Sequence, residues 1–101
     1  MSKSHMGLKR PHKFIARGTV DYVFKRDNGT CVYCGDHAQE IDHVIPTTDG
    51  GNSVKSNLVC VCKKCNTKKA HHIDDPKWLT MSIIWLAQKG EDISWMDDVY
   101  K

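Results

Sequence analysis

Two groups of residues in this 101-residue chain have side chains and spacings suited to chemistry. In the first group, four of the five cysteines form two pairs, each with two residues between its members: Cys31, Cys34, Cys62 and Cys65. Such pairs can bring four thiolates to one tetrahedral Zn²⁺ with Zn–S bonds of about 2.3 Å. Because four sulfurs fill the coordination shell, we expect this metal to be structural. Free buried thiols or disulfides are the alternative.

The second group is Asp42 and His43, adjacent in the otherwise apolar stretch IDHVIP and followed by the loop TTDGG. An imidazole with an ordinary pKa of about 6.5 can accept a proton from water near neutral pH, and a carboxylate can bind a hard cation. Neighbouring strand residues point to opposite faces, so both can serve one site only at a strand edge or distortion. An ordinary polar strand end is the alternative.

Two strands are expected to carry these groups, at residues 39–45 and 57–61. Pro46 closes the first strand, and a loop rich in Thr, Asp and Gly follows it. The connection is too short for a parallel crossover, so the strands should be antiparallel. Cys60, in the second strand, is expected to be a small buried apolar residue rather than a ligand.

Helices are expected within residues 17–29, 62–72, 74–90 and 95–100. Thr19 is the predicted N-cap of the first, and the second Cys pair begins the second. The third is expected to be the main source of the core through its large apolar residues, which are Trp78, Leu79, Ile83, Ile84, Trp85 and Leu86.

The formal net charge is only +3, but basic residues concentrate in 8–17 and 62–72, whereas 91–101 is acidic. Two basic segments on a small protein favour a polyanionic partner, and a solvated lysine-rich surface is the alternative. Lys64, Lys68 and Arg17 are candidate phosphate contacts. Arg26 is another, although its neighbour Asp27 favours an internal salt bridge.

The length predicts one domain at residues 14–101, preceded by a flexible basic arm at 1–13. Within this domain the core motif covers about 17–72, and a helical extension covers 74–101. The polar start MSKSHMGLKR lacks the apolar core of a secretion signal, and no segment has the roughly 20 apolar residues of a membrane span. We therefore expect a cytoplasmic protein of prokaryotic or phage type, with no membrane partner.

The pattern C-x-x-C, IDHVIP, GG and SNLVCVCKKCN-x-x-K, from about Arg17 to Lys69, closely resembles the HNH endonucleases, which have the His-Me finger or ββα-metal fold. The resemblance implies an α+β protein with a small ββα-metal core, a four-cysteine zinc site and flanking helices.

The resemblance also implies roles for individual residues. His43 matches the general base that activates water, and Asp42 matches a ligand of the catalytic cation. Asn57 matches an asparagine that holds the hairpin loop. Asn66 stands where the family name has a second histidine, so this chain would be an HNN variant whose oxygen ligands suit Mg²⁺ or Mn²⁺. Lys69 matches a position that could bind the backbone of the scissile strand, with a surface lysine as the alternative.

The activity implied is hydrolysis of DNA phosphodiester bonds, leaving 5′-phosphate and 3′-hydroxyl ends. One site cuts one strand, so nicking is the default, and double-strand cleavage would need a dimer or two encounters. The expected substrate is double-stranded DNA with weak sequence preference, unless a homodimer or a partner protein supplies specificity. The alternative is a zinc-stabilised nucleic-acid-binding module without catalysis.

Overall fold

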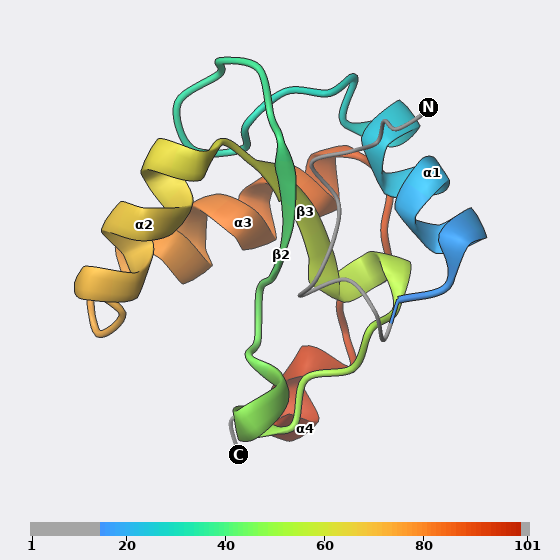
Figure 1. The fold of residues 1–101 in the computed structure, drawn as a ribbon. Helices are drawn as coiled ribbons and strands as arrows, with labels where there is room; N and C mark the ends of the chain where they lie inside the picture. Colours follow the sequence, from blue (N-terminus) through green and yellow to red (C-terminus); the bar gives the residue numbers. More distant parts are fainter. Residues whose placement is uncertain (1–14, 100–101) are drawn as a thin grey trace.

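An antiparallel hairpin of two strands forms the centre of the molecule in a computed structural model that describes residues 15–99 (Figure 1). The predicted arm at 1–13 and the end of the last predicted helix, Tyr100, lie outside the described residues. The fold is α+β, as expected. Its elements are α1 (Arg17–Arg26), β2 (Glu40–His43), β3 (Leu58–Val61), α2 (Lys63–His71), α3 (Lys77–Gln88) and α4 (Met96–Val99), with short 3₁₀ turns at Thr47–Asp49 and Lys55–Asn57.

All four residues of β3 are buried because both faces of the hairpin are covered. Leu58 and Cys60 belong to an apolar cluster with α1, whereas Val59 and Val61 belong to a second cluster that includes Leu86 of α3. This alternation follows from the two-residue period of a strand. Burying each of these large aliphatic side chains contributes about 1.5–3 kcal/mol relative to exposure.

The strand register places the two titratable residues at one end of the hairpin. Asp42 lies opposite Val59, and His43, the last residue of β2, lies opposite Leu58. The chain leaves regular strand geometry directly after His43. Strand β2 is therefore shorter than the predicted strand 39–45. Asp42 and His43 are its last two residues.

The prediction that Thr19 caps the first helix was wrong. α1 begins at Arg17 with Ala16 as N-cap, and the carbonyl of Ala16 accepts hydrogen bonds from the backbone N–H groups of Thr19 and Val20. Ile15 is buried in the cluster between α1 and the hairpin, so packing of the preceding residue sets the helix start. Tertiary contacts thus override the local capping preference.

Helix α3 contributes less to the core than its sequence suggests. Trp78 and Leu86 are buried, but Ile84 is 52% exposed. The other large apolar residues of this helix, Leu79, Ile83 and Trp85, are only partly buried against the second cluster. The strands and the cysteine-bearing segments supply most of that cluster instead. Among residues 15–99, no helix has the length and apolar character needed to cross a membrane.

Candidate active site and metal centre

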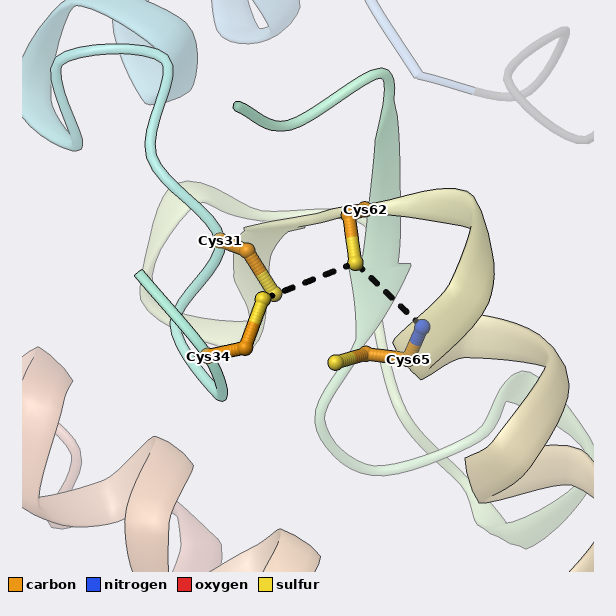
Figure 2. Close-up of side chains that lie close together, drawn as sticks. All are labelled: Cys31, Cys34, Cys62 and Cys65. Atoms are coloured by element: carbon orange, nitrogen blue, oxygen red, sulfur yellow. Dashed lines mark hydrogen bonds between the residues drawn. The ribbon is translucent and has the colours of Figure 1, made fainter. Parts of the chain in front are cut away.

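Four cysteine side chains converge from two segments far apart in the sequence (Figure 2). Cys31 and Cys34 come from the turn after α1, Cys62 follows β3, and Cys65 lies in the first turn of α2. All four sulfur atoms lie within 4.8 Å of one another, and the Sγ atoms of Cys34 and Cys62 are 3.7 Å apart. A tetrahedron with metal–sulfur bonds of about 2.3 Å has edges of about 3.8 Å, so the cluster is positioned to bind a metal ion.

Backbone N–H groups point at these sulfurs, as expected for thiolate ligands. Tyr33 N–H donates to the Sγ of Cys31 at 3.4 Å, and Cys65 N–H donates to the Sγ of Cys62 at 3.3 Å. Burial would raise the pKa of the Cys31 thiol, but surrounding hydrogen-bond donors outweigh burial and lower it. None of the five cysteines forms a disulfide, so the structure favours a metal site over the disulfide alternative.

The fifth cysteine, Cys60, lies outside the cluster. It is fully buried, and its thiol donates to the carbonyl of Val23 at 3.7 Å. Burial raises its pKa well above the ordinary thiol value, so it stays protonated and packs as a small apolar residue, as predicted.

A cleft of about 240 Å³ lies between the end of β2 and α2. Its polar lining unites residues that the sequence separates: Asp42 and His43 from β2, and Asn66 and Lys69 from α2. Pro46, Thr47, Ala70 and Ile73 complete its walls. Asp42 and His43 can face one space because β2 ends at His43 and the cleft lies at that end.

His43 is half-buried in this cleft, and its Nε2 lies 2.9 Å from the hydroxyl oxygen of Ser53. Burial lowers the pKa of His43 from its ordinary value. The carboxylate of Asp42 opposes this effect, and the ammonium of Lys69 adds to it. The net result is an imidazole that stays neutral at lower pH than a solvent-exposed histidine.

Asn66 is oriented by Glu40, the first residue of β2. The Nδ2 of Asn66 donates to the Oε1 of Glu40 at 2.7 Å. A carboxylate only accepts hydrogen bonds, so the amide must present its NH₂ group to Glu40. The Oδ1 of Asn66 is thereby left as the amide atom able to bind a cation.

Lys69 is buried, so the alternative of a surface lysine does not hold. It is only 6% exposed, and its ammonium forms an ion pair with Asp42 and donates to the carbonyl of His43 at 3.3 Å. A buried ammonium needs such partners because desolvation of an unpaired charge is costly. Lys69 could therefore make its predicted contact with a DNA backbone only if a phosphate enters the cleft.

Asn57 holds the loop between the strands through three hydrogen bonds to backbone groups. Its Oδ1 accepts from Ile45 N–H at 2.8 Å, and its Nδ2 donates to the carbonyls of Ile45 at 3.0 Å and Asn52 at 2.8 Å. Asn57 is fully buried, so these bonds satisfy a polar side chain that water cannot reach. They fix the chain immediately after His43.

The remaining basic candidates lie outside the cleft. Lys64 and Lys68 are exposed on α2 and line a separate groove, and Arg17 is exposed at the start of α1. Arg26 is not a phosphate contact, because its guanidinium binds both carboxylate oxygens of Asp27 at 2.7 and 2.9 Å. The expected internal salt bridge is confirmed.

Sequence reasoning missed Ser53 and Glu40, and it did not anticipate the pairing of Lys69 with Asp42. These contacts join residues 10 to 27 positions apart in the chain. The two-residue period of β2 could have placed Glu40 on the same face as Asp42. No local pattern marks Ser53.

The segment that carries the four cysteines and the cleft residues is similar to known proteins. Residues 31–78 match the HNH endonuclease family model. The CRISPR-associated endonuclease Cas9 of Actinomyces naeslundii is 39% identical over 65 residues, which cover 57% of this chain and 6% of that protein. The Cas9 of Corynebacterium diphtheriae is 36% identical over 52 residues, which cover 46% of this chain and 5% of that protein.

A smaller relative is the probable HNH endonuclease of Lactococcus phage SK1. It is 40% identical over 58 residues, which cover 48% of this chain and 62% of the phage protein. The chain thus spans a small part of each Cas9 protein and less than two thirds of the phage protein.

Proposed function

This chain belongs to the HNH endonuclease family, and from that premise we propose that it is a metal-dependent nuclease that hydrolyses DNA phosphodiester bonds. The observation that carries the proposal is the meeting of Asp42, His43 and Asn66 in one cleft, although Asn66 comes from a different element. A binding module without catalysis has no need for a base and two oxygen ligands in one place.

The catalytic cation would be Mg²⁺ or Mn²⁺, held by the carboxylate of Asp42 and the amide oxygen of Asn66. The fit rests on donor chemistry, since both ligands are oxygens and the NH₂ group of Asn66 is occupied by Glu40. When bound, such a cation neutralises negative charge that develops on the phosphate and the leaving oxygen. The ammonium of Lys69 lies in the same cleft and would add a second positive charge.

His43 would act as the general base. In the tautomer whose Nε2–H donates to the hydroxyl of Ser53, Nδ1 carries the lone pair that would accept the proton of the attacking water. The water oxygen forms a bond to phosphorus, the bond from phosphorus to the 3′-oxygen breaks, and the 3′-oxygen takes a proton from solvent. The products are a 5′-phosphate and a 3′-hydroxyl, and one cleft per chain makes a nick the primary event.

A supercoiled plasmid tests this proposal because one nick converts it to the relaxed form. We expect nicking with Mg²⁺ or Mn²⁺, and a loss of at least about 100-fold in His43→Ala, in line with the usual contribution of a general base. The variant should keep its circular dichroism spectrum and its affinity for DNA. If wild type nicks no faster than His43→Ala with either metal, the chain is a binding module and the enzyme proposal is wrong.

We further propose that the four-cysteine cluster holds Zn²⁺ as a structural ion. The ion would tie the turn after α1 to the start of α2, and so would hold the cleft walls in register. Cys31→Ser should lose bound zinc, measured by elemental analysis, and should unfold. His43→Ala is the matched control, because it should keep its zinc and its fold and lose activity. A folded Cys31→Ser protein without zinc would contradict the structural role.

A further inference from the structure

Helix α2 presents two polar faces on opposite sides of its axis. Asn66, Lys69 and Ala70 line the cleft beside β2. A second groove of about 540 Å³ runs along the other side of the helix and the turn after it, lined by Lys63, Lys64, Thr67, Lys68, His71 and His72. The two linings share no residue.

The second groove, here called the basic groove, is suited to a polyanion. All of its lining residues are exposed, and none is acidic. Within residues 15–99, no carboxylate forms an ion pair with Lys63, Lys64 or Lys68. This contrasts with Lys69 on the opposite face, which forms an ion pair with Asp42. The lysines of the basic groove therefore keep their charge available to phosphates.

Helix geometry separates the basic groove from the scissile phosphate. Lys64 and Lys68 each lie two positions from Asn66, which places them roughly 160–200° around the axis. An α-helix with its side chains is about 10–12 Å across, which matches the roughly 12 Å width of the groove in duplex DNA that admits a helix. A phosphate in the cleft and a phosphate in the basic groove are thus separated by about one groove width.

We propose that α2 lies between the two backbones of a DNA duplex, with the strand to be cut in the cleft and the complementary strand in the basic groove. This inference rests on the proposed function and adds which strand of the duplex each face of α2 contacts. Lys64 and Lys68 are then contacts to the strand that is not cut.

A strand-selective charge experiment tests the inference. Two duplexes of one sequence carry a label on the strand whose nicking is followed. One has phosphates in both strands, and the other has neutral methylphosphonates throughout the unlabelled strand. On the fully charged duplex, Lys64→Gln/Lys68→Gln should lower kcat/KM about tenfold or more, because two phosphate contacts are lost. On the hemi-neutral duplex, the same double substitution should have almost no effect, because its partners are already absent.

The matched control is Lys25→Gln/Lys89→Gln, which removes two exposed lysines from other elements and should behave as wild type on both duplexes. An equal loss for Lys64→Gln/Lys68→Gln on both duplexes would place these lysines on the scissile strand and overturn the inference. No loss on either duplex would also overturn it, because the groove would then be only a solvated surface.

Failure of the proposed function can be distinguished from failure of this inference, because wild type would then nick neither duplex. Fluorescence anisotropy on the same two duplexes, without chelator and without added Mg²⁺ or Mn²⁺, still decides the inference. Removal of two phosphate contacts should reduce the slope of log affinity against log salt by about 1.8 on the fully charged duplex. A smaller reduction on the hemi-neutral duplex supports the inference, and an equal or absent reduction overturns it.

Discussion

In the proposed reaction His43 must be neutral to accept a proton, and its surroundings favour that form. Burial lowers its pKa, and Lys69 lowers it further, whereas Asp42 is the one neighbour that raises it. A cation on Asp42 would weaken that single raising influence. All other contributions therefore keep the base active at acidic pH.

We expect the acid limb of the pH profile of kcat/KM to have its midpoint below about 6.5, the ordinary histidine value. Activity should be full above this midpoint and fall as the pH drops through it. Lys69→Met removes a positive charge that lowers the pKa, so its midpoint should move upward. A wild-type midpoint above 6.5, or a downward shift in Lys69→Met, would exclude His43 as the base with this pKa.

The sequence revealed the residues of the proposed site more readily than their partners. Asp42, His43, Asn66 and the cysteines stand at characteristic spacings, so a local pattern identifies them. Ser53 and Glu40 act only through tertiary contacts to His43 and Asn66, and their residue types are common on surfaces. The sequence could not decide between a phosphate contact and a surface lysine for Lys69, because burial of an ammonium depends on the position of its partner, Asp42.

At the level of elements, the loop after β2 packs closely against the residues before β3, and Asn57 and Gly51 make this contact. Gly51 N–H donates to the carbonyl of Pro46 at 3.0 Å, which brings its Cα against the chain. A Cβ at Gly51 would collide with the Ile45 carbonyl and would lie 2.8 Å from the Nδ2 of Asn57. The loop thus requires glycine at this position for close approach. Gly50 is needed for its positive φ of 95°.

Gly51→Ala should therefore lower the free energy of unfolding by at least about 2 kcal/mol, because the added methyl group overpacks a buried hydrogen-bonded turn. In a chain of this size the melting temperature should fall by about 8–16 °C. Gly18→Ala is the matched control, since a Cβ at Gly18 in α1 meets nothing within 4 Å. It should raise stability by about 0.5–1 kcal/mol. Equal melting temperatures for the two variants would show that the turn tolerates a side chain.

At the scale of the whole molecule, Asp27 connects the hairpin to α1 and α3, which extend beyond residues 31–78, the segment matched to the family. Its carboxylate is almost fully buried and accepts four hydrogen bonds, two of them from Arg26. The others come from Cys60 N–H of β3 at 3.1 Å and from the indole N–H of Trp85 in α3 at 2.9 Å. Arg26 in turn donates to the carbonyl of Leu58 at 2.7 Å. One buried ion pair thus connects α1, the hairpin and α3.

Asp27 lies before residue 31 and Trp85 lies after residue 78, so both fall outside the segment matched to the family. We therefore expect the flanking helices to fold together with the nuclease core as one cooperative unit. Asp27→Asn should test this, because the amide removes the negative charge and cannot satisfy four donors with one oxygen. The guanidinium of Arg26 would keep only Glu91, at 3.3 Å, as an ion-pair partner, and removing one partner of a buried ion pair costs about 3–5 kcal/mol.

Thermal unfolding followed both by circular dichroism and by tryptophan fluorescence would measure this effect, since two of the three tryptophans, Trp78 and Trp85, lie in α3. The two transitions should shift downward together by more than about 12 °C. Asp21→Asn, an exposed aspartate of α1, is the matched control and should change stability by no more than about 0.5 kcal/mol. If Asp27→Asn instead separates an early fluorescence transition from an unchanged later one, α3 is an independent appendage. The family segment would then hold its cleft without α3.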